Sequence, residues 1–230
     1  MFKIIFVLFF SFFTLVYLYW LLSFFLGLFN LKKAGQNNQQ YPISILVPAR
    51  NEEKNISNCL YSLIHQDYPA ELYEIIVIND HSTDQTQLKV EEIIRHQGQR
   101  KITLINLPSD RNGKLAALEA GIATSRNKLI FTIDADCVAQ PEWLKRMVRY
   151  FTLEVGGVAG ATFIKQEKTF ISKLESLDVL ALITAGAGSI GRGKPIIANG
   201  SNLAYRRIVF QQVRGYQGIK GTWGDDDLFI

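Results

Sequence analysis

The sequence predicts an α/β domain with a mostly parallel central sheet covered by helices on both faces, preceded by one transmembrane helix. Three observations support this prediction. Residues 4–31 carry no charged side chain. After residue 41, short apolar runs alternate with segments of helical periodicity, as in β-α-β units. The apolar runs end in polar residues, which indicates ligand-binding groups at one edge of the sheet.

The apolar segment 4–31 is predicted to cross a membrane. A helix of about 25 residues spans roughly 37 Å, more than the roughly 30 Å of a hydrocarbon core. A cleaved signal peptide is the alternative, but its apolar region is usually about 7–15 residues long, and "NLKKAGQ" is a poor cleavage site. The positive charge is nearly equal at the two ends of the segment, with Lys3 before it and Lys32 and Lys33 after it. The positive-inside rule therefore does not decide the orientation, which has to be inferred from function.

The composition indicates one domain after the anchor. We predict an anchor at residues 1–31, a polar linker at 32–41 and a single domain at 42–230, because about 190 residues suit one core. The formal charge of +4 comes from scattered Lys and Arg, which argues against a nucleic-acid partner. We expect Cys59 and Cys137 to be free thiols. The three histidines lack ligand spacing, which argues against a histidine metal site.

Four strands and three helices are predicted in alternation. Continuous apolar runs predict strands buried on both faces, and apolar stripes at helical spacing predict the helices between them. The predicted elements are strand 43–49, helix 52–66, strand 73–80, helix 83–97, strand 101–108, helix 114–125 and strand 128–136. The four strands end in "PARNEE", "NDHSTD", "PSDRNGK" and "DADC". Their convergence on one sheet edge is better explained by a binding site than by four solvated loops.

Asp134 and Asp136 are the candidate metal-site residues. In an extended chain, residues two apart point to the same face, so these carboxylates repel each other unless a cation lies near them. Mg²⁺ or Mn²⁺ suits one or two carboxylates and completes its shell with water and phosphate oxygens. Such an ion would neutralise a diphosphate leaving group. A solvated turn is the alternative, because D-x-D is common.

Other polar residues have both a functional and a structural interpretation. Asp80 is placed to accept a hydrogen bond from a base edge or a ribose hydroxyl, whereas Ser82 and Asp84 suit the N-cap of the next helix. Glu52 near a helix start favours the helix dipole, which is the alternative to a ligand contact. Lys114 opposes the dipole at its own helix start, so either an anionic ligand or simple exposure explains it.

The segment from about residue 43 to the end resembles a family 2 glycosyltransferase, an inverting enzyme with the Rossmann-like A-type nucleotide-sugar-binding fold. The resemblance is carried by "ILVPARNEEKNISNCLYSL", "EIIVINDHSTDQT", "NGKLAALEAGI", "TIDADC", "NGSNLAYRR" and "GDDDL". Each motif alone is weak. Together they stand in the family's order and cover nearly all of residues 42–230, which the resemblance therefore identifies as a catalytic domain.

The resemblance implies roles for the residues that match the family's motifs. The nucleotide-sugar-binding positions are Pro48, Arg50 and Glu52 in the first loop, Asp80 at the base, Lys114 near the nucleotide and Asp134 in the D-x-D motif. Asp136 matches the metal position. The sugar and acceptor side is matched by Gly200, Ser201 and Asn202, and the catalytic general base by Asp225.

Three positions depart from the family's pattern. Arg50 stands where an aromatic residue is common, Asn79 precedes Asp80 where two acids are usual, and Gly224 stands where Glu normally precedes the late acid. Because of the last change, Asp226 on the acceptor side competes for the role of base. The chain stops directly after "DDDLFI", so we expect a truncated sequence whose parent continues into an amphipathic segment and further membrane helices.

The implied reaction is metal-assisted single displacement of a nucleoside diphosphate by an acceptor hydroxyl. The implied partners are a nucleotide-diphospho-sugar donor, a glycan, lipid or polysaccharide acceptor, and the bilayer. Nucleotide sugars are made in the cytoplasm, so the domain should face it. A nucleotidyltransferase or another metal-dependent diphosphate enzyme is one alternative, although it leaves "NGSNLAYRR" and "GDDDL" unexplained. A non-catalytic membrane module or an inactive truncated fragment is the other.

Overall fold

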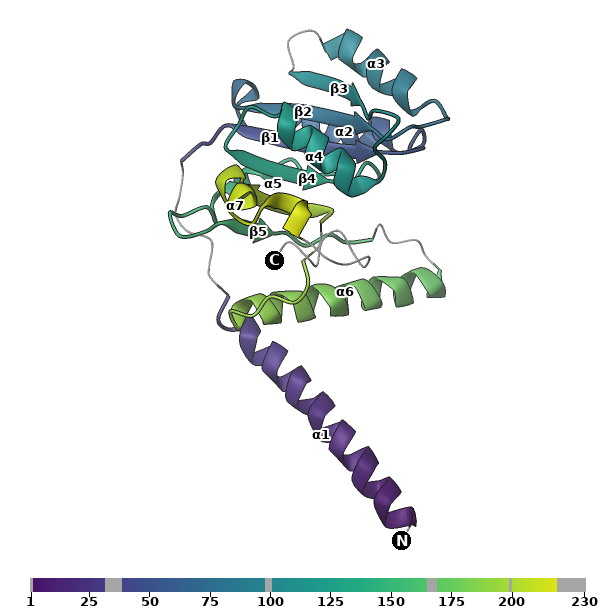
Figure 1. Ribbon diagram of the computed structural model, residues 1–230, viewed down its shortest axis with the longest axis vertical. Helices are drawn as coiled ribbons and strands as arrows, with labels where there is room; N and C mark the ends of the chain where they lie inside the picture. Colours follow the sequence, from purple (N-terminus) through teal and green to yellow (C-terminus); the bar gives the residue numbers. More distant parts are fainter. Residues whose placement is uncertain (1, 32–38, 98–100, 165–168, 199, 219–230) are drawn as a thin grey trace. The chain divides into compact units, whose positions relative to one another are not determined.

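The computed structural model describes residues 2–31, 39–97, 101–164, 169–198 and 200–218 (Figure 1). The chain divides into two compact units. The sheet unit contains residues 34–160 and 199–229, and the helical unit contains residues 1–33 and 161–198 together with residue 230. Residues 161–198, which lie within the domain predicted at 42–230, therefore group with the N-terminal segment.

The sheet unit alternates strands and helices along the chain. Its elements are β1 (Ile43–Ala49), α2 (Ile56–Ile64), the 3-10 turn Ala70–Leu72, β2 (Tyr73–Asn79), α3 (Thr86–Gln97), β3 (Ile102–Asn106), α4 (Lys114–Thr124), β4 (Leu129–Ile133), α5 (Trp143–Val148), β5 (Gly157–Ala159), β6 (Asn202–Arg206), α7 (Arg207–Gln212) and the 3-10 turn Gly215–Gly218.

The strands form a six-stranded sheet in the order β3-β2-β1-β4-β6-β5. The first four strands pair in parallel, with Ile45 of β1 opposite Ile75 of β2 on one side and Phe131 of β4 on the other. β6 runs antiparallel to both β4 and β5. The predicted α/β fold with a mostly parallel sheet is confirmed.

The predicted elements of the sheet unit are all present: β1 has the predicted bounds, and the other six elements are shorter than predicted. The helix predicted from residue 52 begins at Ile56, because the N–H groups of Asn55 and Ile56 both donate to the Glu52 carbonyl oxygen in a preceding turn. The sequence analysis did not predict α5, α7, β5 or β6. The strand β6 lies within the motif "NGSNLAYRR", which was predicted only as a set of binding residues.

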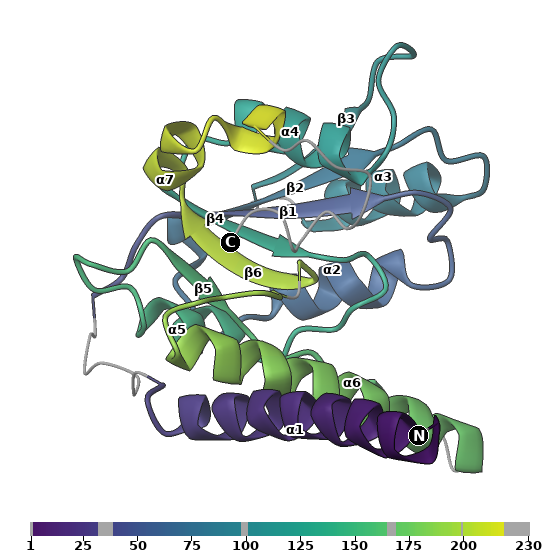
Figure 2. The same ribbon diagram turned by 60° about the horizontal axis from the view of Figure 1, so that its bottom comes forward.

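The buried strands send alternate side chains to opposite faces, as strand geometry requires. One face of β1, including Ile45 and Val47, packs with α2, α3 and α5 in the main core. On the other face Leu46 lies against α4. Figure 2 shows α4 and α2 on opposite sides of the sheet. Covering both faces explains why these strands are continuous apolar runs.

The helical unit consists of two long apolar helices, α1 (Phe2–Leu28) and α6 (Phe170–Gly191). Both are long and apolar enough to cross a membrane, judged by length and composition alone. The N-terminal apolar helix was predicted and is present. The sequence analysis did not predict α6.

Candidate functional site

The strand order reverses at the boundary between β1 and β4. From β1 the chain moves outward through β2 and β3, and it returns to the other side of β1 with β4. β1 pairs with β2 as far as Ala49, but its pairing with β4 stops at Leu46. Pro48, which has no N–H to donate, lies beyond that last pair. Ligands of parallel α/β sheets bind at such a switch point.

The loops after β1 and β2 are held together by reciprocal backbone-to-side-chain hydrogen bonds. The Asn51 N–H donates to Ser82 Oγ at 3.0 Å, and the Thr83 N–H donates back to Asn51 Oδ1 at 2.8 Å. Asn51 and His81 each lie two residues after their strand, with φ of +57° and +56°. Because L-residues rarely adopt this region, the two loops are fixed in an unusual shape by the bonds between them.

Contacts between the same two loops also fix the positions of Glu52 and Asp84. The Glu52 N–H donates to Thr86 Oγ1 at 2.7 Å, and its carboxylate accepts from Asn55 Nδ2 at 2.9 Å. Asp84 Oδ1 accepts from the Thr86 N–H at 2.9 Å, at the start of α3. The predicted capping role of Asp84 is confirmed. The contacts of Glu52 likewise hold the loop in place.

Asp80 is the buried carboxylate of the site, with 6% of its side chain exposed. Its Oδ2 accepts from the Gly113 N–H at 3.0 Å and lies 3.6 Å from Arg50 NH1. Its Oδ1 lies 2.9 Å from His81 Nδ1. Buried charges need such partners. Asp80 therefore ties together the loops after β1, β2 and β3.

Asp134 and Lys114 connect β4 to the start of α4. Lys114 Nζ lies 3.1 Å from Asp134 Oδ1, and the two side chains are 28% and 32% exposed. The Lys114 ammonium group, for which the sequence left two explanations, therefore lies next to the first carboxylate of the D-x-D motif. Arg50, 60% exposed, extends a second cation from the neighbouring strand end.

The D-x-D motif is a turn and not a continuation of the strand. β4 ends at Ile133, and the Cys137 N–H donates to the Asp134 carbonyl oxygen at 3.0 Å, which closes a four-residue turn. The expectation that Asp134 and Asp136 share one face of an extended chain is therefore wrong in its geometry. Asp134 is half-buried beside Lys114, and Asp136 is exposed. The turn still presents both carboxylates at the carboxyl end of the sheet.

Gly200, Ser201 and Asn202 lie beside this turn, because β6 runs antiparallel to β4. Asn202 pairs with Ile133, the last residue of β4. The Gly200 carbonyl oxygen accepts from Thr132 Oγ1 at 2.8 Å. Asn202 Oδ1 accepts from Trp143 Nε1 at 2.8 Å, which gives this side chain a contact within the fold. The structure thus brings the three predicted acceptor-side residues next to the D-x-D turn.

Both cysteines are free thiols, as predicted, and both contact the D-x-D turn. Cys59 Sγ lies 3.6 Å from the Asp134 carbonyl oxygen, and Cys137 Sγ lies 3.5 Å from Asp136 Oδ1. Burial, followed by the charges of Asp136 and Asp134, raises the pKa of Cys137 to about 12. Burial also raises the pKa of Cys59. The two side chains are therefore neutral at physiological pH.

Some residues of the site were not predicted from the sequence, and two of the predicted residues lie outside the part of the chain that the structure describes. His81 and the Gly113 N–H were not predicted, although Gly113 at φ +88° directly precedes α4. The glycine of "NGK", directly before a predicted helix, was the sequence feature that could have indicated the Gly113 N–H. Asp225 and Asp226 lie outside the described residues. Within the described part of the chain, no three His, Cys, Asp or Glu side chains form a metal-binding group.

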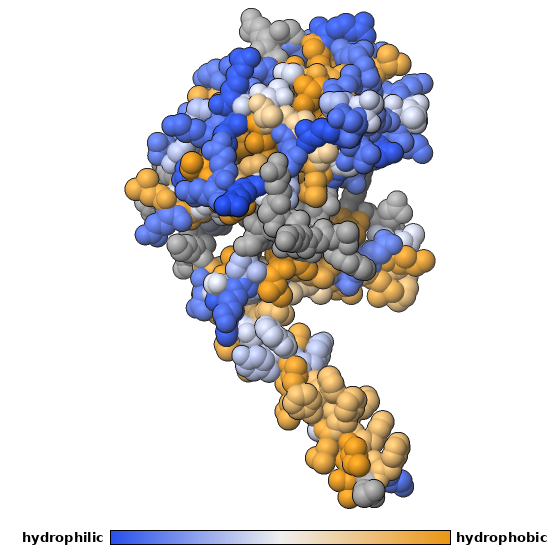
Figure 3. All heavy atoms as spheres, in the orientation of Figure 1, coloured by the Kyte–Doolittle hydropathy of each residue, from blue (hydrophilic) through white to orange (hydrophobic). Residues whose placement is uncertain are grey.

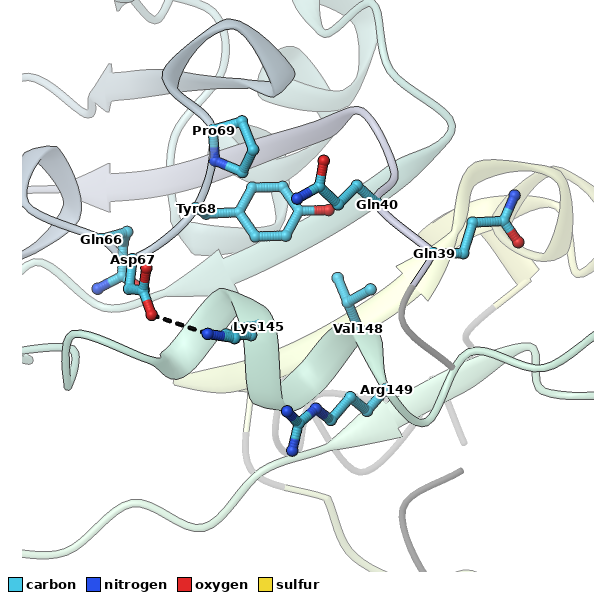
Figure 4. A pocket seen from close by; sticks show the side chains of 9 residues that line it. All are labelled: Gln39, Gln40, Gln66, Asp67, Tyr68, Pro69, Lys145, Val148 and Arg149. Carbon is cyan, nitrogen blue, oxygen red and sulfur yellow. Dashed lines mark hydrogen bonds and ion pairs between the residues drawn. The ribbon is translucent and has the colours of Figure 1, made fainter. Parts of the chain in front are cut away.

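A cavity at the opposite edge of the sheet contains none of the predicted site residues (Figure 4). It has a volume of about 530 Å³ and lies where the chain enters β1 and β2. Lys145 Nζ lies 3.0 Å from Asp67 Oδ2 at its wall, and Arg149 points from α5 beside it. The chemistry of the strand ends therefore identifies the candidate site better than cavity volume does.

The sequence profile described as "Glycosyl transferase family 2" matches residues 44–214. "Probable glycosyltransferase YdaM" of Bacillus subtilis (strain 168) is 32% identical over 212 residues, which cover 87% of this chain and 49% of the relative. The chain thus spans about half the length of this curated relative.

Two solved structures share the fold. A mannosyltransferase, PcManGT from Pyrobaculum calidifontis in complex with GDP-Man and Mn²⁺, has a TM-score of 0.70 and 23% identity, covering 90% of this chain and 57% of that one. S. aureus TarS 1–349 in complex with UDP-GlcNAc has a TM-score of 0.52 and 20% identity, covering 81% of this chain and 51% of that one.

Proposed function

The chain belongs to glycosyl transferase family 2, and on that premise we propose that it transfers a sugar from a nucleotide-diphospho-sugar donor to an acceptor hydroxyl. The observation that carries the proposal is the convergence of charged groups at the β1/β4 switch point. Asp80, Arg50 and the Gly113 N–H meet at one side of it, and Asp134 and Lys114 meet at the other.

These groups suit the parts of a nucleotide sugar. The Asp80 carboxylate, with Arg50 beside it, is assigned to the nucleoside, where a carboxylate accepts from a base N–H or a ribose hydroxyl. Lys114 is assigned to the diphosphate, since an ammonium group pairs with phosphate oxygens as a point charge. Pro48 and Glu52 shape the first loop. On donor binding, Lys114 exchanges part of its contact with Asp134 for the phosphates.

The D-x-D turn fits a divalent cation of the Mg²⁺ or Mn²⁺ type. Such ions need only one or two protein carboxylates when phosphate oxygens complete their shell, and Asp134 and Asp136 supply that donor set. A neighbour of this fold in complex with GDP-Man and Mn²⁺ supports a divalent cation, but not its particular ligands. When bound, the ion would supply charge stabilisation for the leaving diphosphate.

Asp225 is proposed as the general base. Its carboxylate accepts the proton of the acceptor hydroxyl while the hydroxyl oxygen forms a bond to the anomeric carbon. The bond from that carbon to the diphosphate oxygen breaks on the opposite face, so the configuration inverts. Asp226 is the competing base, and Gly200, Ser201 and Asn202 are assigned to the sugar and acceptor side. Base catalysis of this kind contributes about 10²–10⁴-fold in rate.

The proposed architecture is a membrane anchor at residues 1–31, a linker at 32–41 and a catalytic domain at 42–230. The apolar character of α1 supports the anchor. Because nucleotide sugars are made in the cytoplasm, the catalytic domain is proposed to face it. The acceptor is a glycan or a lipid.

Calorimetric titration of the full chain in detergent tests the donor site. The chain is titrated with UDP, GDP and other nucleoside diphosphates, with and without Mn²⁺. We expect one diphosphate to bind in a metal-dependent way, and Asp136→Ala to abolish that binding. Asp67→Ala, which removes an exposed carboxylate at the opposite edge of the sheet, is the matched control and should bind normally. A folded chain that binds no diphosphate would contradict the proposal.

A further inference from the structure

The helix α6 is an apolar helix whose large side chains are not enclosed by the described part of the chain. Within the described residues, its buried positions are Ser172, Gly186, Gly188 and Ser189, and none of its large apolar side chains is buried. Phe170 is 74% exposed and Leu177 is 62% exposed. Large exposed apolar surfaces mark contacts with a partner or a membrane. Figure 3 shows the apolar surface of α1 and an apolar patch over α6.

The connections of α6 to the sheet argue against a membrane-spanning orientation. The chain leaves the sheet after Gly160, whose N–H donates to the Asn202 carbonyl oxygen at 2.8 Å, and rejoins it at β6. Both connections therefore start from one edge of one sheet. If α6 spanned the bilayer, one of the two connectors would have to cross it as well.

Neither connector is suited to crossing a bilayer. Residues 161–169 and 192–198, fully extended, reach roughly 30 Å and 24 Å, against a hydrocarbon core of about 30 Å. The first contains two Lys and one Glu, and the second contains Arg192 and Lys194. An extended connector would also leave backbone groups unsatisfied in lipid, and its charges are costly there.

Three glycines join α6 to the end of α1. A side-chain carbon on Gly188 would collide with the carbonyl oxygen of Phe24, and one on Gly191 would collide with that of Gly27. Close backbone approach through small residues is how helices pack in membranes. In Figure 1 the two helices meet at their C-terminal ends and diverge from there. Parallel axes would stay parallel in every view, so α6 does not run alongside α1.

This crossing sets the depth of α6 if α1 spans the membrane. Phe24 and Gly27 lie roughly 2–6 Å along the helix before its end at Leu28, at 1.5 Å per residue. The crossing therefore lies in the outer part of the leaflet, where interfacial helices lie roughly 5–10 Å deep.

The charges of α6 are separated along its length. Lys173, Glu175 and Asp178 lie in its first half, and the half from residue 179 to 191 contains no charged residue. The first half therefore suits the headgroup region, and the second half suits the acyl chains beside α1.

We propose that α6 is an in-plane membrane helix. It lies tilted in the leaflet where α1 ends, with its C-terminal half in the acyl region against α1 and its N-terminal half near the headgroups. The occupant of its exposed apolar surface is the hydrocarbon of the bilayer. This inference rests on the proposed membrane insertion of α1 and not on the transfer reaction.

Sidedness of labelling tests the orientation in the full chain. Single cysteines are placed at Lys173→Cys and Lys194→Cys, near the two ends of α6, in a Cys137→Ser background that keeps buried Cys59. A membrane-impermeant thiol reagent is applied to right-side-out and inside-out vesicles. Arg95→Cys, exposed on α3, marks the side of the sheet unit, and Lys3→Cys marks the start of α1.

The two orientations give different labelling patterns. An in-plane helix leaves Lys173→Cys and Lys194→Cys reactive from the same side as Arg95→Cys. Reaction of the two ends from opposite sides overturns the proposal. If Lys3→Cys reacts from the same side as Arg95→Cys, α1 does not span, and the proposal is overturned through its premise rather than through the labelling of α6.

A second measurement tests contact with lipid. A fluorophore on Leu180→Cys should be quenched by phosphatidylcholine brominated on its acyl chains, whereas one on Leu88→Cys, 60% exposed on α3, should not. Adding Gly188→Leu should lower the quenching at residue 180, because it breaks the crossing. Adding Ala181→Leu, at an exposed position, should leave it unchanged. Absence of quenching at Leu180→Cys in the parent overturns the proposal, and equal effects of the two additions overturn the glycine crossing.

Discussion

At the scale of single residues, two carboxylates after β2 have different tasks because they have different neighbours. Asp80 is buried and holds groups from three strand ends, including Arg50 and the Gly113 N–H. Asp84, four positions later, accepts from the Thr86 N–H at the start of α3 and from the Glu53 N–H in the loop after β1. The first faces the proposed donor site, and the second supports the backbone that carries it.

Replacing Asp80 by Asn should weaken nucleotide binding. The amide keeps the size of the side chain but removes the charge that faces Arg50, and a hydrogen bond to a charged group contributes about 1.5–3 kcal/mol, or roughly 10–100-fold in affinity. Calorimetry with the preferred nucleoside diphosphate checks this. Asp84→Asn is the control, and equal losses in both variants would argue against a nucleotide contact at Asp80.

Replacing Asp225 by Asn should abolish sugar transfer and leave nucleotide binding within a few fold. The amide cannot accept the acceptor's proton, but the donor site does not depend on that proton. The measurement pairs a transfer assay on the full-length protein with calorimetry. Parallel losses of transfer and binding would remove Asp225 from the role of base, and activity lost only in Asp226→Asn would assign the role to Asp226.

Acid should weaken the fold through Asp84. Burial raises the pKa of this carboxyl, but the hydrogen bonds from Thr86 and from the Glu53 N–H outweigh burial and hold the pKa below its usual value. A group with a lower pKa in the folded state stabilises it above the unfolded pKa of about 3.9, and this contribution disappears as the pH falls through the folded pKa. Denaturant unfolding between about pH 2.5 and 6 should show a shallower acid decline for Asp84→Asn than for the parent. An equally steep acid decline in Asp84→Asn and the parent would contradict this role of Asp84.

At the scale of elements, the site depends on how closely α4 approaches the sheet. α4 lies over Leu46 and Ile78 with Gly121 at the contact. Its first residue, Lys114, contacts Asp134, and the Gly113 N–H just before it contacts Asp80. The position of one helix therefore determines two contacts of the site.

Gly121→Ala should destabilise the protein, although Ala is the better helix former. The added carbon would lie 2.9 Å from Ile78 Cδ1 and 3.1 Å from Leu46 Cδ2. Overpacking of this kind costs about 1–3 kcal/mol, against a propensity gain of about 1 kcal/mol. Denaturant unfolding measures the sum. Ala123→Gly, at an exposed position on the same helix, measures the propensity term, and a stabilised Gly121→Ala would show that α4 has room to move.

At the scale of the whole molecule, the chain combines a polar-edged sheet unit with a helical unit that lacks a large apolar core. The sheet unit contains the main hydrophobic core. The helical unit has α1 and α6, whose large apolar side chains are mostly exposed. We therefore propose that two separate apolar elements hold the sheet unit at a membrane.

Deleting residues 1–31 should reduce membrane association without abolishing it, because α6 keeps its own apolar surface. Adding Leu180→Glu and Leu182→Glu, both exposed in the half assigned to the acyl region, should then release the truncated chain, because charges are costly there. Membrane flotation of the expressed variants measures both steps. Leu88→Glu on α3 is the control for added charge. Full release by the truncation alone would show that α1 carries the whole attachment.

Much of the fold was predictable because its signals are local. The apolar runs of β1, β2 and β4 and the polar ends that follow them are readable within a few residues of sequence. The capping role of Asp84 was predicted in the same way, from its place before a helix. The helix α6 was not predicted, because its apolar residues form no single stripe of the kind that indicates an amphipathic helix.

The sequence by itself determined the α/β class, the N-terminal apolar helix and the set of charged residues at the strand ends, since each depends on neighbours along the chain. Only the tertiary structure decided that β6 inserts antiparallel beside β4, that the D-x-D motif is a turn, and that Asp80 meets Arg50 and Gly113. The physical reason is that the place of β6 and the contacts of Asp80 depend on hydrogen bonds between segments far apart in the chain, and the turn begins where β4 stops pairing with β6. Local periodicity carries no information about such contacts.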